Sequence, residues 1–232
     1  MISIEYVMVA FTDVFLNAFD IPKLRGYFAR KYPEEPLLHN HLEGSKVSYR
    51  YPRIQYRIYQ GHPAILAIHE GIDVLQKIIL DNHQLQIGNK SMMVNEMMVV
   101  SNRAKFGQTA NLIYYKFKSP WMALNQENYK EYVKMATTRQ EQRLKQILKG
   151  NLLTISKGFN YTIPNIDEIA IEGSFHPVSR NFHNVPMHCF SGQFSLSFMI
   201  PEYLALGKQV SRGFGTIVEN KDPTDNTGNQ NA

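Results

Sequence analysis

Two histidines near residue 40 are the side chains of this sequence best suited to proton transfer. His39 and His41 lie in the segment LLHNH. An imidazole titrates near neutral pH, so a histidine can act as a general base or as a general acid. In an extended segment both side chains would project to one side, whereas in a helix they would diverge by about 200° and only one could serve. The residue types therefore suit acid–base chemistry, and the alternative is a pair of solvated or capping loop histidines.

The stretch LGKQVSRGFGTI, residues 206–217, has the composition of an anion-binding loop. Glycines let backbone amides approach an anion closely, and Lys, Ser and Arg side chains donate to phosphate. The candidate residues are Gly207, Lys208, Ser211, Arg212, Gly213 and Gly215. The stretch lacks the Gly-Lys-Ser/Thr spacing of a Walker loop, and it precedes a strand rather than the helix of a dinucleotide fingerprint. Binding of a nucleoside triphosphate is therefore disfavoured.

A third candidate is the segment 49–59, in which aromatic and cationic residues alternate with apolar ones. Alternate side chains of a strand share a face. One face would carry Tyr49, Tyr51, Arg53, Gln55, Arg57 and Tyr59. Aromatic rings stack on bases and arginines neutralise phosphates, so this face suits RNA. The alternative is the solvated face of an amphipathic strand.

The first half of the chain shows the element order that would position these residues. We predict a strand at 2–11, a helix from Asp20 to Lys31, strands at 46–60 and 63–69, a helix at 72–80, and a strand or hairpin at 92–106. This order is the ferredoxin-like pattern of a four-stranded antiparallel sheet with helices on one face.

The second half repeats the order less regularly. We predict a strand at 111–120, a helix at 126–149 ended by Gly150, strands at 152–163, 167–175 and 188–200, and a final strand at 214–219. The predicted fold class is therefore α+β, with ferredoxin-like domains at 1–108 and 109–219. The last residues, 220–232, have almost no apolar side chains and are predicted to be disordered.

Composition narrows the classes of protein and of partner. The chain has 232 residues and a formal net charge of +5, which favours an anionic partner, nucleic acid first. Its single cysteine, Cys189, excludes an internal disulfide framework or a Cys-rich metal site, and its apolar surroundings predict a buried, inert thiol. The N-terminus lacks the features of a signal peptide, and its apolar run is too short to span a bilayer. We therefore expect a cytoplasmic protein that does not enter the membrane.

With these residues in view, the sequence resembles the CRISPR-associated repeat-processing endoribonucleases, the Cas-six family, and specifically its b-type branch. The resemblance rests on LGKQVSRGFGTI near the C-terminus and on LRGYFARKYPEEPLLHNHLEGSKVSYRYPRIQY in the first half. It implies cleavage of CRISPR repeat RNA without a metal ion or other cofactor, through attack of a ribose 2′-hydroxyl on the adjacent phosphate. The product RNA would be the mature guide RNA.

The resemblance also implies roles for individual residues. His41 or His39 would be the acid or base, with His41 slightly favoured. Tyr49 or Tyr51 would orient the nucleophile or donate to the phosphate, and Lys46 would balance charge in the transition state. Arg53 and Arg57, with the candidate residues of the glycine-rich loop, would hold the RNA backbone.

Two other functions stay open from the sequence. One is a non-catalytic RNA-binding subunit of a CRISPR ribonucleoprotein. The other is a metal-dependent hydrolase in which His39 and His41, with Glu43, ligate the ion. Further candidate partners are CRISPR effector-complex proteins and a second copy of the chain.

Overall fold

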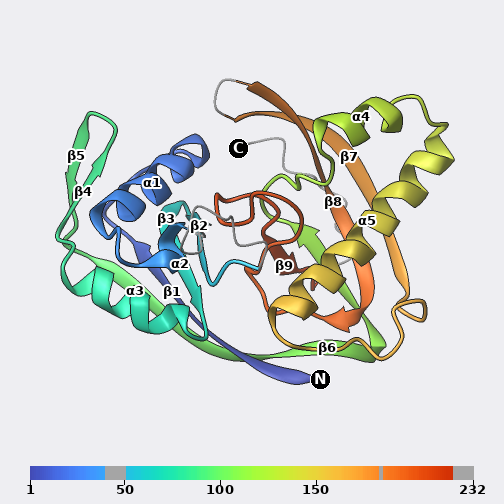
Figure 1. Ribbon diagram of the computed structural model, residues 1–232, viewed down its shortest axis with the longest axis horizontal. Coiled ribbons are helices and arrows are strands. Elements are labelled where there is room, and N and C mark those ends of the chain that lie inside the picture. Colours follow the sequence, from blue (N-terminus) through green and yellow to red (C-terminus); the bar gives the residue numbers. More distant parts are fainter. Residues whose placement is uncertain (40–50, 183–184, 222–232) are drawn as a thin grey trace.

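Long antiparallel strands form most of the framework of the computed structural model, which describes residues 1–39, 51–182 and 185–221 (Figure 1). The first half contains β1 (Ile2–Phe11), η1 (Ala18–Asp20), α1 (Ile21–Lys31), α2 (Pro36–His39), β2 (Ile54–Tyr59), β3 (His62–Ile68), α3 (Gly71–Leu80), β4 (Gln84–Ile87) and β5 (Lys90–Met93). The strand β6 (Met97–Phe117) leads into the second half, which contains α4 (Gln126–Tyr132), α5 (Thr137–Gly158), β7 (Ile171–Phe182), β8 (Val185–Met199) and β9 (Ile217–Glu219).

The first half is a ferredoxin-like domain, as predicted. Its strands lie in the order β2-β3-β1-β6, and every pairing is antiparallel. Without the separate β4–β5 hairpin, these are the second, third, first and fourth strands of the half. Helices α1 and α3 cover one face, where Leu24, Phe28 and Leu75 pack on Val9 and Ile65. The apolar spacing that predicted the two helices is therefore the spacing that builds this core.

The second half has the same strand order. Strand β8 pairs with β7 on one side and β6 on the other, and β9 pairs with the far side of β6. In the sheet these strands lie in the order β7-β8-β6-β9, which are the second, third, first and fourth strands of this half, as in the first half. The loop from Pro201 to Thr216 occupies the place of the second helix of a regular unit. The chain is thus α+β with two tandem ferredoxin-like domains.

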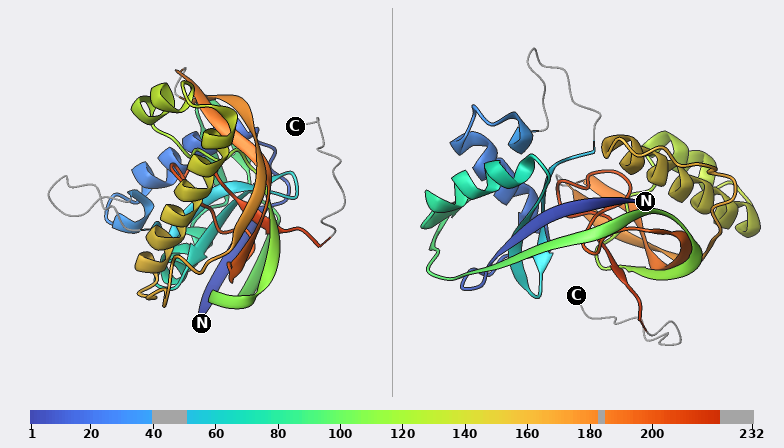
Figure 2. Two further views of the ribbon diagram at one scale, coloured as in Figure 1. Left: turned by 90° about the vertical axis from the view of Figure 1, so that its right-hand side faces the viewer. Right: turned by 90° about the horizontal axis from the view of Figure 1, so that it is seen from below.

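The strand β6 belongs to both domains. Its residues 97–106 pair with β1, and residues from Gly107 onward pair with β8, with a register shift between Gln108 and Ile113. Figures 1 and 2 show it, in green, running from the first half into the second. The prediction of two separate strands at 92–106 and 111–120 was therefore wrong, and the proposed boundary at residue 108 falls inside one strand.

The helical region of the second half also differs from the prediction. A break at 133–136 separates α4 from α5, and α5 continues through Gly150 to Gly158. Buried Leu144, Leu148, Leu152 and Ile155 keep a helical spacing across the glycine. The segment 152–158, predicted as a strand, is therefore the last part of this helix.

The two halves pack through the sheet face of the first half that the helices leave open. Ile4, Tyr6 and Met8 of β1 share one hydrophobic cluster with Phe194 of β8 and with the helix α5. This packing covers the face of β2 that the sequence assigned to RNA. The strand itself spans only Ile54–Tyr59, and residues 40–50 lie outside the described residues.

Cys189 is buried, as expected, and burial raises the pKa of its thiol to about 11. Asn220 is also buried, and its backbone amide donates to Tyr114 O over 2.7 Å. The rest of the predicted tail, 222–232, lies outside the described residues. Within the part of the chain that the structure describes, no helix has the length and apolar character needed to cross a membrane.

Candidate functional site

The glycine-rich loop packs directly against the first domain. Tyr56 of β2 and Arg212 of the loop form a parallel β-bridge, and the Tyr56 amide donates to Ser211 O over 3.3 Å. At Gly213, a Cβ atom would lie 3.2 Å from Ile21 Cγ2, at the start of α1. Figure 1 shows the loop, in dark red, between β2 and the helices of the second half. A segment near the end of the chain thus reaches the first helix.

Two glycines of the loop are required by close packing. Gly207 has a φ of +94°, and a Cβ there would lie 2.6 Å from Trp121 Nε1. Gly215 has a φ of +69°, and a Cβ there would collide with Leu206 O. Only glycine adopts such a backbone without strain at so close an approach. Their demonstrated role is to fix the path of the loop, whereas anion binding by their amides remains a prediction.

The polar side chains of the loop differ in exposure. Lys208 is exposed and anchored by its amide, which donates to Met122 O over 2.9 Å. Ser211 and Arg212 are half-buried. Arg212 Nη1 donates to Gln209 Oε1 over 3.0 Å, which orients the guanidinium.

His39 ends the short helix α2, close to α1. Its Nε2 lies 3.3 Å from Tyr32 O, and its backbone oxygen accepts a hydrogen bond from Arg25 Nη2 of α1. His39 is half-buried. His41, Lys46 and Tyr49 lie outside the described residues, so of the proposed catalytic residues the structure places His39 and Tyr51.

Arg25 connects the histidine segment to the loop. Burial lowers the pKa of Arg212, and the positive charge of Arg25 lowers it further. Burial raises the pKa of Tyr56, an effect that Arg25 partly offsets. The structure therefore brings His39, Arg25, Tyr56 and Arg212 into one region. Sequence reasoning missed Arg25, although an arginine between the buried Leu24 and Phe28 sites is a signal that could have drawn attention to it.

Tyr51 lies in the packed contact between the halves. It is 6% exposed, its hydroxyl donates to Ala205 O over 2.9 Å, and the Ala205 amide donates back over 3.1 Å. Both hydrogen-bonding functions of the hydroxyl are thus directed at the backbone. This geometry gives Tyr51 a structural role, and the catalytic role that the resemblance implied stays a prediction.

Arg57 and Arg53 are also engaged between the halves. Arg57 is 1% exposed, donates to Gln55 Oε1, and has its pKa lowered to about 10 by burial. Arg53 donates to Glu70 Oε1 and to Gly158 O, each over 2.7 Å. The second domain covers that face of β2 and buries Arg57, so the structure gives no support to the RNA contact of Arg57, which stays a prediction. Arg53, half-buried, stays a candidate only at the edge of this contact.

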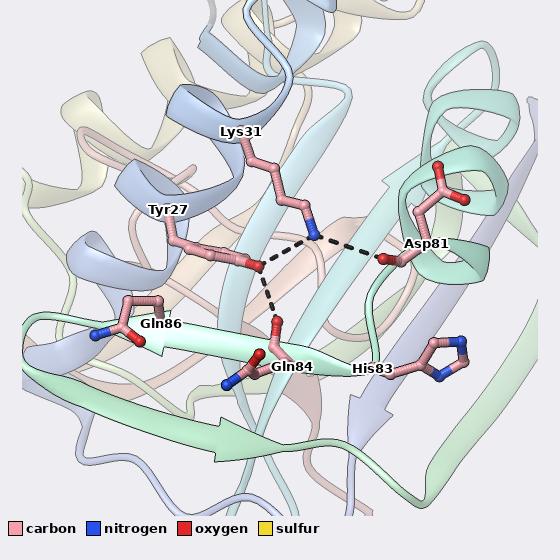
Figure 3. A pocket seen from close by; sticks show the side chains of 6 residues that line it. All are labelled: Tyr27, Lys31, Asp81, His83, Gln84 and Gln86. Carbon is pink, nitrogen blue, oxygen red and sulfur yellow. Dashed lines mark hydrogen bonds between the residues drawn. The ribbon is translucent and has the colours of Figure 1, made fainter.

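A polar pocket opens elsewhere, between α1 and the β4–β5 hairpin (Figure 3). Tyr27 donates to Gln84 O over 2.8 Å, and Lys31 donates to the Tyr27 hydroxyl and to Asp81 O. These groups satisfy one another. The pocket contains neither a candidate histidine near residue 40 nor a residue of the glycine-rich loop, and so it is separate from the candidate site.

The described residues provide no group of three or more His, Cys, Asp or Glu side chains arranged to hold a metal ion. The ligands proposed for the metal-dependent alternative include His41 and Glu43, which are not among those residues. The region offers the imidazole of His39, the Arg25 guanidinium bonded to the His39 backbone, and the loop that carries Arg212 against β2. Chemically, this combination suits proton transfer at a phosphate group.

Comparisons with known proteins agree with this architecture. Residues 2–105 match the family model described as the Cas6b N-terminal domain, and residues 107–220 match the Cas6b C-terminal domain. A structure described as a crystal structure of Cas6b has 38% identity and a TM-score of 0.89, with 94% of this chain and 100% of that chain covered. A structure of a CRISPR RNA processing endoribonuclease Cas6b has 34% identity and a TM-score of 0.77 at the same coverage of both chains.

An uncharacterised protein of Methanocaldococcus jannaschii is 32% identical over 142 residues, which span 61% of this chain and 96% of that protein. The two family models together cover nearly the whole length of the chain, and each corresponds to one of the tandem domains. This chain belongs to the Cas6b family.

Proposed function

We propose that this protein is an endoribonuclease that cleaves the repeat RNA of CRISPR transcripts to produce mature guide RNAs. Membership of the Cas6b family supports this function, and one similar structure carries the description of a CRISPR RNA processing endoribonuclease. The observation from this chain that carries the proposal is the contact between its two signature segments. The loop at 206–217 packs on α1 and β2, next to the helix that ends at His39.

The proposed reaction needs only groups that protein and RNA supply. A base removes the proton of a ribose 2′-hydroxyl, whose oxygen then bonds to the adjacent phosphorus. The bond from phosphorus to the 5′-oxygen breaks, and an acid protonates the departing oxygen. The products are a cyclic phosphate and a 5′-hydroxyl. An imidazole can supply either proton transfer, and fixed cations stabilise the charge that develops on the phosphate.

We propose the following roles for individual residues. His39 is a proposed acid or base, and Lys208, Ser211 and Arg212 are proposed contacts to the RNA backbone. His41, Lys46 and Tyr49 keep the roles that the resemblance implies. Effector-complex proteins, a second copy of the chain and a cytoplasmic location also remain proposals.

The proposal is tested by incubating the purified protein with a repeat RNA in excess EDTA. We expect cut RNA whose fragments end in a cyclic phosphate and a 5′-hydroxyl. A DNA strand of the same sequence should bind without being cut, because it lacks the 2′-hydroxyl. This control shows whether cleavage depends on the ribose 2′-hydroxyl as the nucleophile.

The two other functions give different results in the same assay. RNA that is bound but stays intact would identify a non-catalytic binding subunit. Cleavage that appears only after a divalent metal is added would identify a metal-dependent hydrolase. Either result would contradict the proposed mechanism.

A further inference from the structure

His39 is held at its backbone and at its ring. Arg25 Nη2 of α1 donates to the His39 backbone oxygen, and His39 Nε2 lies 3.3 Å from the backbone oxygen of Tyr32, the residue that follows α1. A carbonyl oxygen can only accept a hydrogen bond, so Nε2 carries a proton in this contact. In the neutral imidazole the lone pair is then on Nδ1.

The Tyr32 carbonyl belongs to the turn that ends α1. The Tyr32 amide still donates to Phe28 O over 3.0 Å, but its φ of −127° and ψ of 70° lie outside the helical range. Tyr32 O accepts from the Glu35 amide over 3.2 Å in addition to its contact with the imidazole. The two bonds are compatible, because a carbonyl oxygen has two lone pairs. Any change in this turn would therefore move the acceptor of the His39 ring.

The side chain of Tyr32 is anchored to the segment after α3. Asn82 is fully buried, and its Nδ2 donates to the Tyr32 hydroxyl over 2.6 Å and to Ile78 O. Its Oδ1 accepts from Lys31 Nζ over 2.6 Å and from the Tyr27 hydroxyl over 3.0 Å. Both donors and both lone pairs of the amide are used, which fixes its orientation. Tyr32 is thus tied to a buried and fully satisfied polar group.

The histidine segment is also anchored by packing. Leu38, next to His39 in α2, is 1% exposed and belongs to the same hydrophobic cluster as Leu24 and Phe28 of α1. A backbone and a ring that are both held leave the imidazole little freedom before RNA binds. Proton transfer is efficient when the reacting group is already in place.

We propose that Tyr32 and Asn82 are positioning residues for His39, and that Nδ1 is the nitrogen of His39 that takes a proton from the RNA or gives one to it. This inference rests on the proposed function. As a base, Nδ1 takes the proton of the 2′-hydroxyl while the 2′-oxygen bonds to phosphorus. As an acid, Nδ1 of the imidazolium gives its proton to the departing 5′-oxygen. In both roles Nε2–H stays bonded to Tyr32 O, and this bond is stronger while the ring is charged.

The tautomer of His39 is tested in the folded protein without RNA. In histidine labelled with the heavy isotope of nitrogen, the chemical shift separates a protonated ring nitrogen from one with a lone pair, and His39→Gln identifies the signals of His39. Spectra are recorded at about pH 8.5, where a solvent-exposed imidazole is neutral. We expect His39 to be entirely the Nε2–H tautomer, whereas exposed His83 shows the averaged shifts of both tautomers. Averaged shifts at His39, or a proton on Nδ1, would overturn the proposal.

The positioning role is tested with two matched removals of a hydroxyl. Tyr32→Phe and Tyr27→Phe each remove a hydroxyl that bonds to Asn82, but Tyr32 is the one whose backbone bonds to the His39 ring. In Tyr32→Phe we expect single-turnover cleavage of repeat RNA in EDTA to fall about tenfold with affinity near wild type, because a misplaced reacting group slows the chemical step. Tyr27→Phe should cut and bind like the wild type. The single tautomer of His39 should persist in Tyr27→Phe and be lost in Tyr32→Phe.

The possible outcomes separate this inference from the proposed function. If the wild type cuts repeat RNA and Tyr32→Phe cuts as fast as Tyr27→Phe, the inference is wrong and the proposed function stands. The same conclusion follows if His39→Ala cuts at the wild-type rate. If the wild type does not cut repeat RNA, the proposed function fails and proton transfer at Nδ1 fails with it, even where His39 shows a single tautomer. Should Tyr32→Phe not fold, the spectra of the wild type still decide the tautomer.

Discussion

Tyr51 shows at the scale of a single residue how a side chain suited to catalysis can serve packing instead. Its hydroxyl both donates to and accepts from the backbone of Ala205, a residue 154 positions later in the chain. The ring packs edge-on against Phe159, with centroids 5.3 Å apart. Tyr51 therefore connects the two domains at a buried point from which water is excluded.

Replacing Tyr51 with Phe should lower the free energy of unfolding. The change leaves two buried backbone groups of Ala205 without a partner, at a cost of about 1–3 kcal/mol. Cleavage per folded molecule should stay unchanged. Urea unfolding and single-turnover cleavage measure the two quantities. Tyr59→Phe is the matched control, because among the described residues its hydroxyl accepts a hydrogen bond only from exposed Gln60. Loss of cleavage in Tyr51→Phe at unchanged stability would show that the Tyr51 hydroxyl acts in catalysis.

Arg57 gives the complementary prediction for RNA binding. Because it is 1% exposed, Arg57→Met should leave repeat-RNA affinity within about twofold of wild type, provided that the protein is folded. The salt slope should also stay the same. Fluorescence of the buried Trp121 can verify folding before affinity is measured. A tenfold loss of affinity in folded protein would show that the face of β2 is accessible to RNA after all.

These two residues also show what the sequence could reveal about the site. The types and spacing in LLHNH and in LGKQVSRGFGTI indicated both segments, because histidine and the glycine-rich pattern carry their chemistry locally. The alternation at 49–59 indicated which residues share a face. It could not reveal that the second domain covers this face, since that contact joins Tyr51 to Ala205 across most of the chain.

At the scale of the element, the length of the helix α5 follows its stripe of buried apolar residues, and a glycine within it does not end the helix. Gly150 lies within the helix and has no positive φ. A Cβ built there would meet no atom within 4 Å. The sequence prediction took this glycine as a stop signal, but burial of Leu148, Leu152 and Ile155 against the sheet outweighs the small local cost of one glycine.

Gly150→Ala should therefore stabilise the protein by about 0.5–1 kcal/mol. Alanine restricts the unfolded chain and adds no clash in the folded one. The measurement is urea unfolding of the variant and the wild type. Gly158→Ala in the same helix is the control, and it should destabilise because its Cβ would collide with Tyr51. A loss of stability in Gly150→Ala would contradict a continuous helix.

At the scale of the whole molecule, the shared strand β6 and the common hydrophobic cluster join the two domains, so we expect them to unfold as one cooperative unit. Residues 97–106 of β6 complete the first sheet, and residues 107–117 are central to the second. The element order predicted two ferredoxin-like units. Their fusion was not predictable from local patterns, because it depends on contacts between residues such as Met8 and Phe194 that are distant in the sequence.

A substitution in the core of the first domain should therefore also lower the stability of the second domain. Leu24 of α1 is fully buried, so Leu24→Ala should cost about 2–5 kcal/mol. Trp121, which lies in the second half and donates to Asn151 Oδ1 over 3.0 Å, is the only tryptophan of the chain. Its fluorescence transition in urea should shift by the same amount as the far-UV circular dichroism transition. A Trp121 transition that does not move would show that the halves unfold independently.

The connection between the domains has a functional consequence, since the loop of the second domain can reach α1 only if the two sheets keep their relative position. Arg212 bridges to Tyr56, and Gly213 rests against Ile21. The proposed active centre is thus a property of the assembled molecule, with the imidazole supplied by one domain and the phosphate contacts largely by the other.

The most direct test of this centre is single-turnover cleavage of repeat RNA by His39→Ala and His41→Ala, with affinity measured in parallel. His83→Ala is the control, because His83 is exposed and lines the separate pocket beside the β4–β5 hairpin. We expect at least one of the first two variants to lose about 100-fold or more in rate while binding stays near wild type, and His83→Ala to cut normally. Wild-type rates in both variants would contradict an imidazole beside the glycine-rich loop as the proton-transfer group.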